Sequence, residues 1–350
     1  MKELLYDLTM LNGIPAHEKE IKNYVCDYAK DKAEISFDKL GSVILKHGNG
    51  GPKIMVSGHM DEVGFIVVEI TKDGYLKFTN AGSLWGHVVL AQQMVVTTLD
   101  GRTLVGVVGS KPPHILDANE KNKVLEINQM YLDLGVSSKE EVENLGIQIG
   151  DMITPLINTR VLANPKYLLG KAWDDRFGVA CCLEVLDNIQ NQSHPNTYFG
   201  VCSVQEEVGL RGAMTSAYKV TPDIGISLDV TIAYDYPSGS NETKLGKGPC
   251  LVVTDSSMIG HVGLRKYVMN LCKELNIPYQ LSYLNRGGTD AGKIHLNKEG
   301  CPSIAICIPC RYLHSHTSII HEDDYNNTVK LITEIIKRLD KETVDKITYE

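Results

Sequence analysis

The sequence predicts an α/β protein in which a mostly parallel sheet is flanked by helices and a small β-barrel-like domain is inserted. The second half of the chain alternates between helix-type and strand-type segments, which is typical of βαβ units and a parallel sheet. Between about Phe65 and Lys166, short alternating apolar segments are instead separated by Gly-rich turns, with hardly a helical pattern. We therefore expect a discontinuous main domain, residues 1–65 and 167–350, and an inserted β domain at 66–166.

The first elements predicted along the chain are two helices and two strands. Apolar residues recur at helical spacing over residues 4–11 and again over 21–28, and Gly13 lies in the break between them. The apolar runs SVILK (42–46) and KIMVSG (53–58) are short and bounded by glycine, which predicts buried strands.

The later elements follow the same rules of periodicity and length. In the insert, the predicted strands are YLKFT (75–79), MVVTT (94–98) and TLVGVV (103–108). The second half is predicted to contain a helix at 176–189, strands at 197–205 and 223–229, a helix at 261–275, a strand at 301–309 and an amphipathic helix at 322–339.

Composition excludes several classes of protein. The chain of 350 residues is 43% apolar and 22% charged, which is ordinary for a globular protein and long enough for two domains. A formal net charge of −8 without any basic stretch argues against a nucleic-acid partner. We expect no membrane span and a cytoplasmic location, because no run of 18 apolar residues and no small-residue cleavage site occurs.

The nine cysteines do not predict a disulfide framework, because they are odd in number and lie mostly in apolar runs. Cys307 and Cys310 have the spacing of a redox or metal pair. No second pair completes a four-thiolate zinc site, so two thiols at a strand end is the favoured interpretation.

Histidine or carboxylate residues follow five of the apolar runs directly. These residues are His59, Asp61 and Glu62; Asp174 and Asp175; Glu206 and Glu207; Asp229; and His314. Ligands in open α/β sheets bind beyond the carboxyl ends of the strands, so we expect the five groups at one edge. Each group alone would indicate a helix cap or a solvated face. Their coincidence after successive buried strands favours one shared site.

These residue types predict a pair of divalent cations. Carboxylates gathered beside imidazoles would repel one another, and bound cations would remove that conflict. Nitrogen and oxygen ligands without cysteine suit Zn²⁺, with Co²⁺ or Mn²⁺ as alternatives. Each ion could take one histidine, one terminal carboxylate and one oxygen of a shared carboxylate, which leaves a position for water.

Further side chains are expected to act beside the metals. Asp61 is spaced to accept the second N–H of His59, which would fix the imidazole ring. If Glu207 binds a metal, Glu206 is placed to take a proton from the attacking water. Near the C-terminus only one histidine of His314, His316 and His321 is needed, and surface positions are favoured for His316 and His321.

Seven motifs together carry a family resemblance. They are GHMDEVGF (58–65), GVVGSKPPH (106–114), KAWDDR (171–176), EEVGLRGA (206–213), LDV (228–230), GGTDA (287–291) and RYLHS (311–315). With these motifs the chain resembles the co-catalytic metallo-aminopeptidases, which include glutamyl aminopeptidase and the tetrahedral aminopeptidases, some of them named endoglucanases. The resemblance spans nearly the whole chain.

The resemblance implies a metal-dependent aminopeptidase that hydrolyses the N-terminal residue from a peptide substrate. It also implies how the ligands divide: His59 and Asp229 on one ion, Glu207 and His314 on the other, Asp174 between the two, and Glu206 as the general base. The implied main domain is catalytic, and the inserted domain serves dimerisation. The implied assembly is a homodimer, which in tetrahedral members builds a hollow dodecamer.

Two departures from the family pattern leave local questions open. His316 replaces the proline of the usual HSP, so either His314 or His316 could point inward. Trp173 stands where a smaller residue is common, which leaves the shape of the substrate pocket open.

Three further functions are weighed against an aminopeptidase. A deacylase is one, and a glycosidase is another, but glycoside hydrolysis needs two carboxylates without metal and would leave His59 and His314 unexplained. A non-catalytic, metal-stabilised assembly protein is the third, and it would have no need of Glu206. The sequence does not predict which N-terminal residue is preferred.

Overall fold

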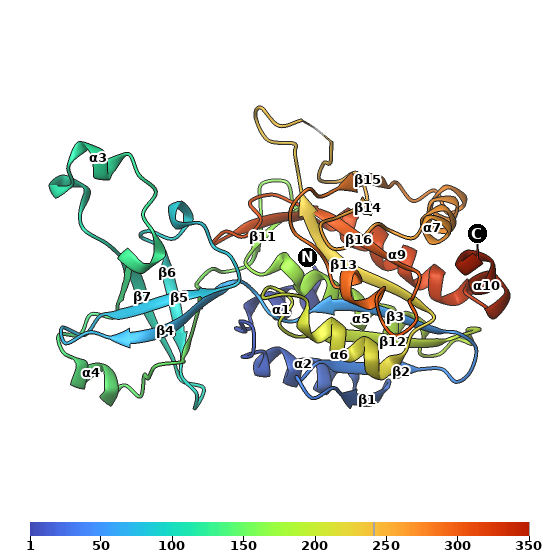
Figure 1. The fold of residues 1–350 in the computed structure, drawn as a ribbon, viewed down its shortest axis with the longest axis horizontal. Coiled ribbons are helices and arrows are strands. Elements are labelled where there is room, and N and C mark those ends of the chain that lie inside the picture. The colour runs from blue at the N-terminus through green and yellow to red at the C-terminus, as the bar shows by residue number, and fades with distance from the viewer. Residues whose placement is uncertain (241, 350) are drawn as a thin grey trace.

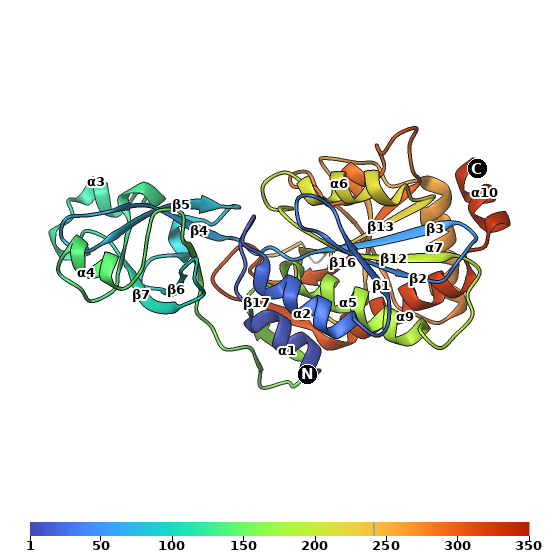
Figure 2. The ribbon, with the colours of Figure 1, turned by 90° about the horizontal axis from the view of Figure 1, so that it is seen from below.

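The computed structural model describes residues 1–240 and 242–349, and it consists of an α/β body and a smaller β barrel. The two parts lie side by side, and both chain ends are on the α/β body (Figures 1 and 2). The predicted class, a largely parallel α/β sheet with a barrel-like insert, is confirmed.

The body is built on an eight-stranded sheet in the order β1-β2-β12-β3-β13-β16-β14-β15. Its strands are β1 (Glu34–Phe37), β2 (Val43–His47), β3 (Lys53–His59), β12 (Thr197–Ser203), β13 (Ile224–Ile232), β14 (Cys250–Thr254), β15 (Gln280–Tyr283) and β16 (Ser303–Cys310). The four central strands, β12, β3, β13 and β16, are parallel to one another. Their side chains are buried on both faces, which explains why these segments read as continuous apolar runs. The residues that come after these four strands therefore lie at the same edge of the sheet.

Helices cover both faces of this sheet. One face carries α1 (Glu3–Met10), α2 (Lys19–Ala29), α5 (Trp173–Ile189), α7 (Val262–Glu274) and α9 (Glu322–Arg338), with α10 (Lys341–Tyr349) against α7. The other carries α6 (Arg211–Val220) and α8 (Ala291–Ile294), as Figure 2 shows for α6. Alternation along β3 produces the two cores, because Ile54 and Val56 pack with the first set and Met55 with the second.

The insert is a closed barrel in the order β4-β5-β8-β7-β6-β9. Its strands are β4 (Gly64–Ile70), β5 (Leu76–Ala81), β6 (Gln93–Thr97), β7 (Thr103–Gly109), β8 (Tyr131–Asp133) and β9 (Met152–Pro155). Closure leaves no unpaired edge between these strands, and Phe65 and Phe78 pack inside with ring centroids 4.6 Å apart. The predicted domain limits at 66–166 stay a prediction.

The sequence pattern did not predict the short helices of this region. They are α3 (Ala118–Lys121), α4 (Lys139–Asn144) and the 3-10 turns η1 (Gly86–Val88), η2 (Pro113–Ile115) and η3 (Ile127–Gln129). None is long enough to show a helical repeat of apolar residues. The start of α4 is instead marked by Ser138, whose hydroxyl accepts from the N–H of Glu141 at 3.2 Å.

A second small sheet joins the return from the barrel to the end of the body. It contains β10 (Arg160–Val161), β11 (Tyr167–Gly170) and β17 (Ser318–His321). Pairing of β11 with β17 places Gly170 opposite Ser318. The loops that carry Asp174 and His314 are therefore held next to each other.

The cysteines are free thiols, nine in number. Cys307 and Cys310 are both buried within β16, as the strand interpretation predicted. Among the described residues, no helix combines the length and the apolar character that crossing a membrane requires.

A buried ionic network fixes the N-terminal segment against the sheet. Arg176 is fully buried and donates to the carbonyls of Met60, Leu8 and Leu11 at 2.8, 2.6 and 3.0 Å. The Glu62 carboxylate accepts from Lys171 at 2.6 Å and lies 3.4 Å from Arg176. The network satisfies several carbonyls that are hidden from water.

We expect Arg176→Met to lower the free energy of unfolding by about 3–5 kcal/mol, because it leaves several buried carbonyls without their donor and removes one of the two buried cations beside Glu62. Urea unfolding followed by circular dichroism measures the change. Arg160→Met is the matched control, since Arg160 is exposed and makes one backbone contact. Equal stabilities of the two variants would contradict this role of Arg176.

Candidate metal centre

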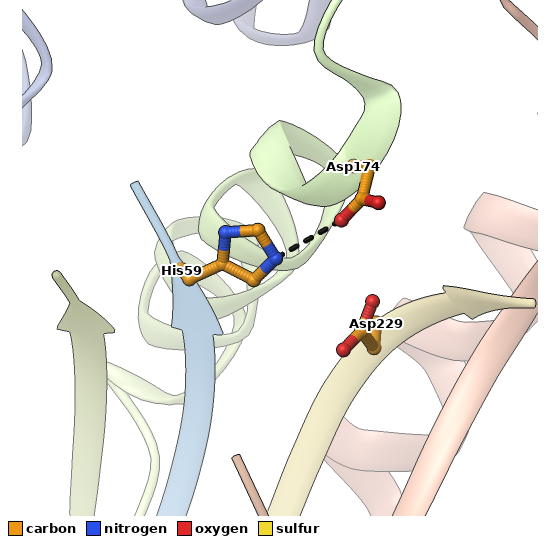
Figure 3. A group of neighbouring side chains, drawn as sticks. All are labelled: His59, Asp174 and Asp229. Carbon is orange, nitrogen blue, oxygen red and sulfur yellow. Dashed lines mark hydrogen bonds and ion pairs between the residues drawn. The ribbon is translucent and has the colours of Figure 1, made fainter. Parts of the chain in front are cut away.

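The carboxyl ends of the central strands bring three predicted residues together (Figure 3). His59 ends β3, Asp229 lies on β13, and Asp174 lies at the start of α5. Nε2 of His59 is 3.0 Å from Oδ1 of Asp174. One ligand atom from each residue lies within 4.8 Å of the others, which is close enough for one cation to bridge them.

A second group forms around the other oxygen of the same carboxylate. Nε2 of His314 is 3.2 Å from Oδ2 of Asp174 and 3.5 Å from Oε2 of Glu207. Asp174, Glu207 and His314 offer ligand atoms that again lie within 4.8 Å of one another. Asp174 thus belongs to both groups and presents one oxygen to each histidine.

Tight backbone turns aim these side chains. Ala172, Gln205 and His314 all have left-handed backbone conformations, with φ of 54°, 56° and 52°. Asp174 and Asp175, which are joined by a cis peptide bond, have non-helical dihedral angles within the first turn of α5. The backbone therefore turns at His314 itself, and two residues before Asp174 and Glu207.

Asp175 fixes the junction between β3 and α5. Its carboxylate is fully buried and accepts the backbone N–H of His59 and of Gly178, each at 3.0 Å. A Cβ at Gly178 would meet this carboxylate at 2.2 Å, so only glycine fits there. The sequence pattern predicted Asp175 at this edge but indicated no separate role for it.

Asp61 holds the backbone of the two glutamates. Its carboxylate oxygens accept the N–H groups of Glu206 and Glu207, both at 3.1 Å. Nδ1 of His59 is 3.0 Å from the backbone carbonyl of Asp61 and 3.6 Å from its nearer carboxylate oxygen. Asp61 thus orients the His59 ring mainly through its main chain, whereas the spacing of the two residues predicted that the carboxylate would do so.

Glu206 stands beside the two groups without belonging to either. Its Oε2 is 3.8 Å from Nε2 of His59, and the side chain is nearly buried. Burial raises the pKa of Glu206 well above its usual value, the nearby His59 charge opposes this rise, and the charges of Asp229 and Glu207 add to it. A carboxyl group whose affinity for protons is raised in this way suits proton transfer.

The charges of the cluster favour a bound cation. Burial raises the pKa of Asp229 well above its ordinary value and that of Glu207 to about 8, and the charge of Asp174 adds to both shifts. Burial would also raise the pKa of Asp174, but hydrogen bonds to His314 and His59 hold it well below its usual range.

One buried atom tests whether the residues fit a metal. Oε1 of Glu207 has no hydrogen-bond partner among the described residues, although it is hidden from solvent. A buried carboxylate oxygen normally has a partner. This unpaired oxygen, within a donor set of two imidazoles and three carboxylates, fits a bound divalent cation.

The other two histidines lie elsewhere. Nε2 of His316 donates to the backbone carbonyl of Gln93 in the barrel at 3.1 Å. The predicted surface position is wrong for His321, which is buried at the end of β17 because it packs against Tyr167, and which accepts from the N–H of Asp323 at the start of α9. His314 is the histidine of this segment that lies in the cluster, and Trp173 is fully buried in the core.

The cluster opens into a cavity of about 1060 Å³. The carboxylates of Asp174, Glu206, Glu207 and Asp229 line it together with His314. Trp173 is not among the residues that line it. The cluster therefore lies in the wall of a cavity rather than in the closed core.

Sequence reasoning missed a further support beneath the cluster. Asp290, from the GGTDA motif, is buried and accepts the hydroxyls of Ser57 and Ser203 at 2.7 and 2.5 Å. These contacts tie β3 and β12 together just below His59. The only sequence signal for it was an aspartate within a quoted motif, without any apparent partner.

The fold and the cluster together define a metallopeptidase-like α/β protein with an inserted barrel. The sequence pattern of the M42 glutamyl aminopeptidase family matches residues 41–331, and the chain belongs to this family. The family resemblance predicted from the motifs is thus confirmed.

Named relatives agree with this assignment. The putative aminopeptidase FrvX of Escherichia coli is 37% identical over 347 residues, which cover 98% of this chain and 97% of that protein. A TET aminopeptidase from a marine sediment Thaumarchaeota archaeon has a TM-score of 0.96 at 44% identity, over 99% of this chain and 98% of that one. Pyrococcus horikoshii TET1 peptidase has a TM-score of 0.87 at 30% identity, over 96% and 99%. Family membership supports a metal-dependent aminopeptidase.

We expect Asp61→Ala to weaken divalent-metal binding by about 10–100-fold, because the backbone of Glu207 loses the carboxylate that accepts its N–H. Competition with a chromophoric chelator measures the affinity. Asp73→Ala is the control, since Asp73 is exposed in a barrel turn. Unchanged affinity in Asp61→Ala would show that the glutamate loop holds its position without this carboxylate.

Proposed function

We propose that this chain hydrolyses the N-terminal residue from peptides by a mechanism that depends on two divalent cations. The observation that carries the proposal is the sharing of Asp174 between two ligand groups, one with His59 and one with His314. Two cations on either side of one carboxylate form an open catalytic site when each keeps a position free for water or substrate.

The division of ligands follows from the two groups. His59 and Asp229 would hold one cation, Glu207 and His314 the other, and Asp174 both. Zn²⁺ suits these nitrogen and oxygen donors, and Co²⁺ or Mn²⁺ are the alternatives. The cations would supply Lewis acidity, which lowers the pKa of water and polarises the scissile carbonyl.

Glu206 would move the proton. It lies within the same cavity as the cluster and next to His59, and its raised proton affinity suits a general base. It would accept the proton of the attacking water and pass it to the nitrogen of the leaving amine. The Asp61 carboxylate would keep Glu206 in place by accepting the backbone N–H of Glu206.

Cleavage at the N-terminus follows from charge. A peptide has a positive charge at its α-amino group, and Glu206 is the carboxylate of the cavity wall that would hold no cation. Attraction of the ammonium group would place the first peptide bond, rather than an internal one, against the cluster.

The other functions differ in their need for metal. A glycosidase would act without the cations, a deacylase would need them but not a free α-amino group, and a structural metal protein would show no turnover. The two histidines in the cluster and the names of the relatives favour the aminopeptidase.

We also propose that the chain assembles with copies of itself through the barrel. The P. horikoshii TET1 relative is described as assembling into a tetrahedron or a large octahedral shell. On the barrel, Val105 and Val107 of β7 are 56% and 42% exposed on one side of the strand. Neighbouring exposed apolar side chains of this kind suit an interface between two copies of the chain.

We expect chelator treatment to abolish hydrolysis of aminoacyl amides, and Zn²⁺ or Co²⁺ to restore it. Glu206→Gln should keep two metal ions per chain by elemental analysis but lose at least about 100-fold in kcat, because the proton acceptor is gone. Release of the amine is followed across acidic, basic and apolar N-terminal residues.

Glu140→Gln, at an exposed position in α4, is the control and should keep wild-type rates. Wild-type turnover by Glu206→Gln with its metals bound would remove Glu206 from the mechanism. Hydrolysis of a β-glucan at a rate that chelator does not change would favour a glycosidase instead.

We expect Val107→Lys to lower the mass measured by sedimentation velocity, because a charge on the outer face of β7 opposes burial between copies. Ile259→Lys, which changes an even more exposed apolar residue on the α/β body, should leave the mass unchanged. A wild-type monomer, or an unchanged mass in Val107→Lys, would be contrary to assembly through the barrel.

A further inference from the structure

A segment of the barrel borders the metal centre directly. A Cβ on Gly82 would lie 3.3 Å from Cβ of Glu207, so the backbone at Gly82 runs against this glutamate. Ser83, the next residue, lines the same cavity as Asp174, Glu207 and His314. The barrel residues that come after Ser83 therefore start at the cluster itself.

This segment forms one wall of a second cavity, of about 840 Å³. The opposite wall comes from the loop after β16, including Tyr312 and His316. Ser83, Tyr312, Leu313 and His314 line both this cavity and the one that contains the carboxylates. The two cavities thus meet at the His314 side of the cluster.

The second cavity has an aromatic rim, which consists of Trp85, His87 and Tyr312. Trp85 is 61% exposed and Tyr312 is 58% exposed. The rings of Trp85 and His87 pack edge to face, with centroids 4.4 Å apart. Large aromatic side chains that are left exposed beside a reactive centre are suited to bind an apolar group.

The aromatic rim is held in place relative to the cluster. The N–H of Val88 donates to the carbonyl of Trp85 at 3.0 Å, which closes the turn η1. The hydrogen bond from His316 to Gln93 joins the two walls of the cavity. His316, the residue that departs from the family pattern, thus connects the barrel to the loop that carries His314.

Charge separates the roles of the two cavities. The first is lined by four carboxylates, and Glu206, the one that would hold no cation, would attract the α-ammonium group of the N-terminal residue. Among the described residues that line the second, none is a carboxylate. The leaving part of the peptide, beyond the scissile bond, has no ammonium group before cleavage. The second cavity, which is lined without carboxylates, therefore suits it better than the first.

We propose that the aromatic rim binds the side chain of the second residue of the peptide, the first residue of the leaving part, and that it favours a large apolar side chain there. This inference rests on the proposed aminopeptidase function. It gives the barrel a part in substrate selection, since Trp85 and His87 both belong to the insert.

The test compares dipeptide amides that share the best N-terminal residue X from the amide screen and differ in the second residue. Wild-type kcat/KM should be about 3–10-fold higher for X-Phe-NH₂ than for X-Gly-NH₂, which is the range of one aromatic contact. Trp85→Ala should reduce this ratio to about one, and Trp85→Phe should restore most of it. The ratio, rather than the absolute rate, is the readout, because a merely structural defect would lower both rates together.

Tyr218→Ala is the control, because Tyr218 is 70% exposed on α6 and lines neither cavity. It should keep the wild-type ratio. A wild-type ratio near one, or an unchanged ratio in Trp85→Ala, would overturn the proposal. If Trp85→Ala instead lowers the assembly mass while the ratio persists, the rim is an interface between copies. Failure to cleave any dipeptide amide with metals bound would refute the proposed function and this inference with it.

Discussion

The arrangement of this site depends on one carboxylate whose two oxygens each lie close to a histidine. Asp174 lies 3.0 Å from His59 and 3.2 Å from His314, through different oxygens. This arrangement is possible only if the end of β3, the start of α5 and the loop after β16 meet at one point. The parallel central strands bring the first and third of these to the same edge. The pairing of β11 with β17 then sets the α5 loop against the loop of His314.

The buried charges around this point divide into two sets with different consequences. In the first set, the Glu62 carboxylate has two buried cations beside it, Lys171 and Arg176, which also donate to backbone carbonyls of the N-terminal segment and hold it in place. The cluster carboxylates have no such balance, and burial raises the pKa values of Glu207 and Asp229. Residues behind the cluster do not relieve this charge but fix the backbone, as Asp61 and Asp175 do by accepting N–H groups. The protein thus keeps a site that is rigid in its main chain and favourable for cations.

The barrel is more than an attachment to the α/β body. Its backbone at Gly82 runs against Glu207, and the hydrogen bond from His316 to Gln93 links it to the loop of His314. A displacement of the barrel would therefore shift Glu207 and the loop that carries His314. Assembly through the outer face of the barrel and selection of the leaving peptide at its inner end would then be coupled through one rigid unit.

The sequence by itself determined which segments become long helices and buried strands, and which residue types come after them. Periodicity and composition act locally, so they predicted β3, β12 and β16 and the cluster residues that follow these strands, but not short elements such as α4, which has only six residues. Only the tertiary structure decided that His314 rather than His316 enters the cluster, that the Asp61 carboxylate accepts from the glutamate backbone, and that Trp85 stands beside the site. These three outcomes depend on where separate loops come to lie against one another, which is set by packing between distant segments and not by any local pattern.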